Sequence, residues 1–168
     1  MDRAVAIANE FLRKPGGQSL TQMQLQKLVY MAHGWTLALT GEPLTIEEPE
    51  AWDYGPVYSD LYDHTKLFGR SAIGREITSD DDEAARFFAR ERGSATPYVA
   101  NLTTEQRQII DQVWARYGNL SGARLSSLTH QPGTPWSQTY DGARGRVIKN
   151  EAIQAHYCDI AQRAQAAS

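Results

Sequence analysis

Apolar residues recur at intervals of three and four positions along most of this chain, which is the spacing of one face of an α-helix. Glycine, proline or short polar runs separate these segments and mark helix ends. The expected helices cover residues 4–12, about 20–40, 57–68, 84–92, 104–117, 122–128 and 150–164. The pattern therefore predicts a mainly α-helical fold.

The strongest pattern lies in the second of these segments. Its apolar positions are Leu25, Leu28, Val29, Ala32, Trp35 and Leu39, which form a stripe along one side of a helix. Ser19 stands three residues before Gln22, and this spacing favours a capping box at the helix start. Gly41 is typical of a helix end, and Pro43 cannot continue the helix.

The stretch 44–54 lacks helical spacing and favours a small β element. Ile46 and Trp52 suggest a short extended piece or hairpin, and Pro49 restricts that piece to a sheet edge. Gly55 and the proline after it favour a turn, with the proline at the first position of the next helix.

A second short strand is expected around Ile73 and Ile77. The acidic run after Ser79 resembles a helix start, because carboxylates suit the positive end of the helix dipole. Near the C-terminus, Asn150 is expected to cap the last helix. The patterns together predict a compact single-domain bundle of six or seven helices with a small two- or three-stranded β element.

Length and composition are those of one globular domain spanning residues 1–168. Hydrophobic residues make up 41% and charged residues 22%, and no apolar run is long enough to cross a membrane. The first residues lack the apolar core of a secretion signal. Cys158 is the single cysteine, so no internal disulfide can form. We therefore expect a cytoplasmic protein without a membrane partner.

The charge pattern argues against nucleic acid as a direct partner. The net charge is −3, and the 17 lysines and arginines are scattered among 20 acidic residues. Nucleic-acid binding usually depends on clustered basic residues that neutralise phosphates.

Motif searches predict no catalytic, cofactor-binding or metal-binding residue. The sequence contains no nucleophile elbow, no phosphate-binding loop and no dinucleotide fingerprint. None of the four histidines lies four residues from another, so a metal site lacks the usual spacing. A catalytic group that assembles in space, such as His130 with Asp53 or Asp60, stays open as an alternative.

Two histidines have two possible roles. His33 can be a histidine at the edge of the core that bonds a backbone carbonyl, or a polar group displayed at a binding groove. His130 can interact with the carbonyls at a helix end, or it can belong to a rigid contact surface. The turn that follows it carries two prolines and a glycine before Trp136.

Aromatic side chains are concentrated between positions 30 and 62. Trp and Tyr dominate the energetics of protein–protein interfaces, so this density points to recognition of another protein. The candidate partner-binding residues are Tyr30, His33, Trp52, Tyr54, Tyr58, Tyr62, His130 and Trp136.

Several blocks of the chain resemble the Panacea-domain, or SocA-like, antitoxin family. They are L-Q-K-L-V-Y-M-A-H-G-W at 25–35, T-G-E-P-L at 40–44 and E-A-W-D-Y-G-P-V at 50–57. The motif L-S-S-L-T-H at 125–130 and the pair P-W at 135–136 follow in the same order. The resemblance covers roughly residues 5–160 and is loose over 71–100.

This resemblance implies a mainly helical antitoxin of a bacterial or phage toxin–antitoxin pair, carried on a mobile element. The implied partner is a cognate protein toxin encoded by an adjacent gene, and the expected mechanism is direct binding rather than catalysis. Some relatives carry an added DNA-binding domain, for which this chain has no room. The toxin's identity and the oligomeric state do not follow from the resemblance.

Three alternatives stay open at this point. The chain can act as an adaptor that delivers the toxin to an ATP-dependent protease, as one branch of the family does. It can be an enzyme that reverses the toxin's modification. It can also be a mobile-element protein that binds a host factor instead of a toxin.

Overall fold

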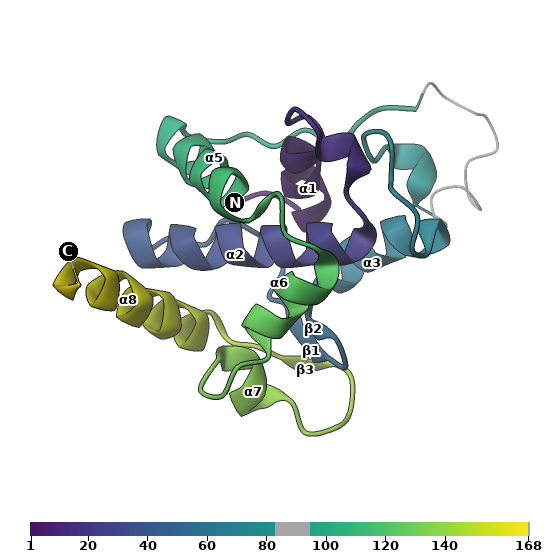
Figure 1. Ribbon diagram of the computed structural model, residues 1–168. Coiled ribbons are helices and arrows are strands. Elements are labelled where there is room, and N and C mark those ends of the chain that lie inside the picture. Colours follow the sequence, from purple (N-terminus) through teal and green to yellow (C-terminus); the bar gives the residue numbers. More distant parts are fainter. Residues whose placement is uncertain (83–94, 168) are drawn as a thin grey trace.

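A computed structural model describes residues 1–82 and 95–167 (Figure 1). Its α-helices are α1 (Ala4–Leu12), α2 (Gln22–Thr40), α3 (Ser59–Thr65), α5 (Thr104–Tyr117), α6 (Gly122–Thr129), α7 (Pro135–Thr139) and α8 (Asn150–Ala166). Short 3-10 helices cover Gly17–Ser19, Lys66–Phe68 and Ser79–Asp81. None of the helices in the described ranges combines the length and apolar character that crossing a bilayer requires.

Three short strands form one antiparallel sheet. They are β1 (Glu50–Trp52), β2 (Gly55–Val57) and β3 (Arg146–Val147), in the order β2-β1-β3. β1 and β2 form a hairpin, and β3 joins the other edge of β1 from near the C-terminus. The predicted helical fold with a small β element is therefore confirmed.

Helix α2 runs through the middle of the molecule and has no exposed face over much of its length. Every residue from Leu25 to Gly34 is buried. The helix packs against α1, α3, α5, α6, α8 and β2, and in Figure 1 these elements lie around it. The single apolar stripe expected from the sequence was therefore too narrow a description of this helix.

The start of α2 lies two residues after the predicted capping box. The Thr21 hydroxyl accepts a hydrogen bond from the Gln24 amide, and the Gln24 side chain accepts one from Thr21 N–H. Ser19 instead belongs to the preceding 3-10 helix. The predicted end at Gly41 is confirmed, because Gly41 has a φ of 77° that favours glycine.

The turn and helix predicted at Pro56 are wrong. Pro56 lies inside β2, and α3 begins only at Ser59. Position 56 of β2 is compatible with proline because β2 is an edge strand. A strand through Ile73 and Ile77 is also absent: both side chains are buried, and the segment makes only isolated bridges at Ala72 and Thr78.

Of the other predicted helix starts, two are confirmed and one is shifted by one residue. Thr103 and Ser121 cap α5 and α6 as expected. Asn150 is the first residue of α8 rather than its cap, which is Lys149. The helix expected over 84–92 lies outside the described residues.

A buried amide side chain fixes the chain after β2 against α2. Gln26 Nε2 donates to the Tyr58 carbonyl oxygen (3.1 Å), and Gln26 Oε1 accepts from Tyr58 N–H (2.8 Å). The amide thus bonds the backbone as a neighbouring strand would, and no buried peptide group of Tyr58 is left unpaired. Asn9 on α1 holds the backbone of Ile77 in the same two-way manner.

Glycine allows α8 to approach α2 closely. A Cβ built at Gly34 would lie 2.3 Å from the ring of Tyr157, closer than any real contact. Tyr157 is buried there and packs edge-on against Tyr30 and Trp35. The contact seats the C-terminal helix on the central one.

Lys27 is a buried cation on α2. Its side chain is 1% exposed, and Nζ donates to the Pro56 carbonyl oxygen at 2.9 Å. Burial lowers the pKa of Lys27 to about 7, because the charged form loses its hydration and no described carboxylate lies within ion-pair distance.

Replacing Gln26 with leucine should lower the free energy of unfolding by about 1–3 kcal/mol, because Tyr58 N–H would then be buried without a partner, while the Tyr58 carbonyl keeps its bond from Tyr62 N–H at 2.9 Å. Gln22→Leu is a matched control on the same helix. It loses one exposed hydrogen bond, to the Gly69 carbonyl, and should change stability by less than about 0.5 kcal/mol. Urea denaturation of both variants measures the difference, and equal losses would contradict the role given to Gln26.

Lys27→Met should stabilise the protein by about 1–4 kcal/mol at pH 6, because it removes a buried charge. Below pH 7 the lysine is charged in both folded and unfolded chains. Between about pH 7 and 10.5 only the unfolded chain keeps the proton. The stability of the wild type therefore rises with pH over this range, and the difference in stability between Lys27→Met and the wild type becomes smaller.

Chemical denaturation of wild type and Lys27→Met from pH 6 to 10 checks this expectation. Lys149→Met is the control, since Lys149 is exposed and pairs with Glu48 at 2.9 Å. A wild-type stability that fails to rise relative to Lys27→Met over this range would contradict the assignment.

Candidate functional site

The turn of the β1–β2 hairpin is held by side chains from the α6–α7 region. Trp136 Nε1 donates to the carbonyl oxygen of Trp52 (2.8 Å), and Ser126 Oγ donates to that of Tyr54 (2.9 Å). His130 Nε2 lies 3.2 Å from the Asp53 carbonyl oxygen. Two carbonyls of the turn thus accept hydrogen bonds from side chains and the His130 ring lies against the third, which fixes the conformation of the turn.

Aromatic rings pack on both sides of this turn. Trp52 and Tyr62 meet edge to face with centroids 4.9 Å apart. On the other side, Trp136 lies between His130, at 3.9 Å, and Tyr140, at 4.7 Å. Two ring clusters therefore lie beside the turn, and the Trp136 indole joins the second to the backbone of Trp52.

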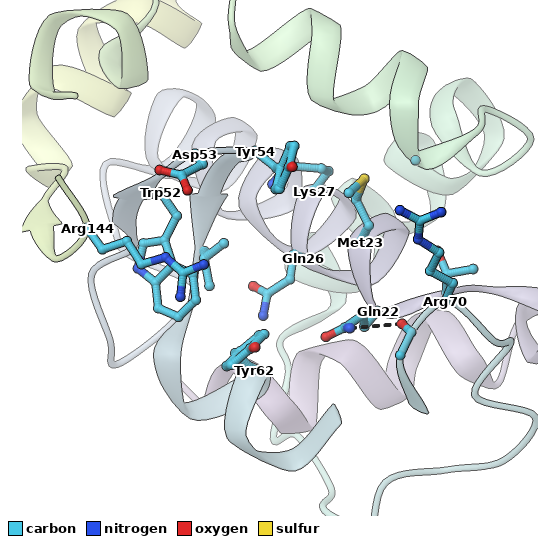
Figure 2. Close-up of a pocket in the computed structure, with 14 residues that line it drawn as sticks. Gln22, Met23, Gln26, Lys27, Trp52, Asp53, Tyr54, Tyr62, Arg70 and Arg144 are labelled. Carbon is cyan, nitrogen blue, oxygen red and sulfur yellow. Dashed lines mark hydrogen bonds between the residues drawn. The ribbon is translucent and has the colours of Figure 1, made fainter. Parts of the chain in front are cut away.

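A groove of about 580 Å³ runs between α2 and the hairpin (Figure 2). Its volume is in the range of pockets that hold a ligand or an anchoring side chain. Its lining comprises Thr21, Gln22, Met23, Gln26, Lys27, Trp52, Asp53, Tyr54, Val57, Tyr62, Gly69, Arg70, Gly122 and Arg144. Segments more than a hundred residues apart in the sequence therefore share one surface.

The charged groups of the groove are mostly positive. Lys27 lies in its wall, with the pKa lowered by burial to about 7. Arg70 and Arg144 are exposed, and the Arg144 guanidinium lies 4.7 Å from the centre of the Trp52 ring. The Asp53 carboxylate accepts a hydrogen bond from the Tyr140 hydroxyl at 2.7 Å.

Five of the eight candidate partner-binding residues come together at this place. Tyr54 is 67% exposed at the turn, and Trp52, Tyr62, His130 and Trp136 are half-buried around it. We call these five residues the hairpin surface. The two aromatic groups expected separately from the sequence, around Trp52 and around His130, thus form a single surface.

The other three candidates, Tyr30, His33 and Tyr58, are buried and not displayed at the surface. Tyr30, His33 and Tyr58 are at most 2% exposed. Tyr58 precedes α3 in an extended conformation and is buried in the core, because the helix begins two residues later than the sequence pattern indicated. Burial raises the pKa of both tyrosines. These side chains stabilise the frame beneath the surface.

Of the two roles considered for His33, its contacts support the structural one. Its Nε2 donates to Asn150 Oδ1 at 2.8 Å, and its Nδ1 accepts from Thr45 N–H at 3.2 Å. Burial lowers the pKa of His33 to about 4, so the ring is neutral at pH 7. It ties α2 to the loop before β1 and to the start of α8.

The catalytic pairs considered from the sequence are not assembled. His130 faces the backbone of Asp53 rather than its carboxylate. The Asp60 carboxylate instead pairs with Arg3 at 2.7 Å. Among the described residues, no group of three or more histidine, cysteine or acidic side chains could hold a metal ion.

Sequence reasoning missed Lys27, Tyr140 and Arg144. Lys27 lies between Leu25 and Leu28 in the strongest apolar pattern of the chain. A charged residue at such a position could have indicated a buried cation with a special role. Tyr140 and Arg144 flank the Asp141-Gly142 loop, and nothing in their local pattern indicates that they reach the hairpin.

Comparison with known proteins agrees with the resemblance seen in the motifs. Residues 25–137 match the family described as "Antitoxin SocA-like, Panacea domain". The chain is also similar to Antitoxin SocA of Caulobacter vibrioides (strain NA1000 / CB15N), with 29% identity over 142 residues that cover 83% of this chain and 71% of that protein. No solved structure matches the chain.

The matched family region contains Lys27 and all five residues of the hairpin surface. It extends over more than half of the sequence. This chain therefore belongs to the SocA-like, Panacea-domain antitoxin family.

Proposed function

We propose that this protein neutralises a cognate toxin by binding it directly through the hairpin surface. The observation that carries this proposal is the tip of the hairpin, where Tyr54 is 67% exposed on a turn that Ser126 and Trp136 hold by hydrogen bonds to its carbonyls. Such an aromatic group is a typical interface anchor. Because the turn is already ordered, binding costs less conformational entropy than it would for a free loop.

The mechanism is occlusion of the toxin's working surface in a stoichiometric complex. A specific complex of this kind buries more than about 1,000 Å². The partner is a protein toxin encoded by an adjacent gene. His130 faces the backbone of Asp53 and the Asp60 carboxylate pairs with Arg3, so neither catalytic pair considered from the sequence supports a reaction on the toxin.

Tyr54→Ala should weaken binding of the adjacent gene product by about 2 kcal/mol, or roughly thirtyfold, because it removes an exposed anchor. Calorimetric titration of purified proteins measures this, and co-expression in cells should show reduced neutralisation. Val99→Ala is the control, since Val99 is 70% exposed and does not line the groove. Equal affinities for the two variants would contradict the assigned surface.

The protease-adaptor alternative makes a different prediction. An adaptor neutralises its toxin only when the ATP-dependent protease is present, whereas occlusion works in a protease-deficient strain. Comparing growth and toxin half-life in the two strains separates the mechanisms. An enzyme would rescue growth at substoichiometric amounts, so titrating antitoxin against toxin excludes or supports that reading.

A further inference from the structure

The groove beside the hairpin surface contains a cation without a counter-ion. Lys27 is 1% exposed, and the Pro56 carbonyl is the acceptor within hydrogen-bond distance of its Nζ among the described residues. An ammonium group has three N–H donors, so two are left without a protein acceptor in this part of the chain. Burying such a charge is costly, and an apolar side chain of the same length would avoid the cost.

The hairpin leaves space for this ammonium group at Gly55. A Cβ at Gly55 would lie 2.8 Å from Lys27 Cε and 2.7 Å from Thr129 Oγ1. Gly55 also has a φ of 105°, which other residues rarely adopt. The glycine therefore gives the lysine the space it occupies, between the hairpin and α6.

The rim of the groove is positively charged, like Lys27. Arg70 and Arg144 are exposed on its two sides, and neither makes an ion pair with another described residue. Asp53, the acidic residue of the lining, is held by Tyr140. In a chain whose net charge is −3, three cations around one groove are a local feature that favours an anionic occupant.

The walls of the groove indicate what carries that anion. Met23, Trp52 and Tyr62 supply apolar and aromatic surface next to the lysine, and Figure 2 shows Trp52 and Tyr62 on one side with Met23 and Arg70 on the other. The groove is continuous with the hairpin surface through Trp52, Tyr54 and Tyr62. An acidic residue with apolar neighbours in a protein chain matches this combination of charge and apolar wall.

We propose that the groove binds an acidic side chain of the protein partner, flanked by apolar residues, and that Lys27 is its charge partner with Arg70 and Arg144 at the rim. The inference rests on the proposed function, because it treats the groove as part of the toxin-binding surface. The carboxylate would accept the two N–H groups that Lys27 leaves free and would form charge-assisted hydrogen bonds.

The test uses the full chain and two synthetic peptides, acetyl-Leu-Glu-Phe-amide and acetyl-Leu-Gln-Phe-amide. NMR of protein labelled with ¹³C-lysine follows Lys27 Cε, which is assigned by its loss in Lys27→Met. The glutamate peptide should bind about tenfold more tightly than the glutamine peptide, as expected for a hydrogen bond to a charged group. It should also raise the pH midpoint of the Lys27 signal.

Two variants give the comparison its control. The tenfold preference should disappear in Lys27→Met and persist in Lys149→Met, which changes an exposed lysine paired with Glu48. Lys27→Met exchanges a buried charge for an apolar chain of similar length, so it should fold. Equal binding of both peptides to the wild type, or an unchanged Lys27 midpoint, would overturn the proposal.

Two further outcomes separate this inference from the proposed function. If 3-phenylpropionate binds as tightly as the glutamate peptide, the groove takes a small acid and the proposed occupant is wrong. If Lys27→Met neutralises the adjacent gene product as well as wild type does, the inference fails and direct toxin binding stands. If the wild-type chain neutralises no neighbouring gene product, the proposed function fails and the peptide result is unaffected.

Discussion

The burial of α2 on all sides from Leu25 to Gly34 is the constraint on which the rest of the structure depends. The buried polar side chains of such a helix need hydrogen-bond partners from other parts of the protein. Gln26 forms hydrogen bonds with the backbone of Tyr58, and His33 forms hydrogen bonds with Thr45 and Asn150. Each of these bonds joins α2 to a different segment, so the polar residues of the helix determine which segments cover it.

The same logic explains why the hairpin is rigid although it is short. Two three-residue strands contribute few backbone hydrogen bonds, and an isolated hairpin of this size is marginally stable at best. Here the side chains of Ser126, His130 and Trp136 bond the turn from outside. The aromatic surface is therefore supported by helices and not by the sheet alone.

Helices and their ends were largely predictable from the sequence, because periodicity and capping are local properties. Thr103, Ser121 and Gly41 mark ends where the structure has them. Pro56 was misjudged because proline suits both a helix start and an edge strand, and only pairing with β1 decides between them.

The site was less predictable than the helices. Residue type indicated Trp52 and Trp136, but exposure depends on packing. The start of α3 at Ser59, two residues after the expected start, places Tyr58 in the core instead of on the flank of the helix. The position of Arg144 over Trp52 depends on how the loop before β3 returns to the hairpin. Such long-range contacts leave no local pattern.

The wide sequence separation of the groove's lining has a consequence for protein synthesis. Its walls combine α2 with the hairpin and with Arg144. A nascent chain that has exposed only α1 to α5 has neither the side chains that brace the turn nor the last arginine of the rim. The surface that we propose for partner binding is therefore complete only after residues through Arg144 have left the ribosome.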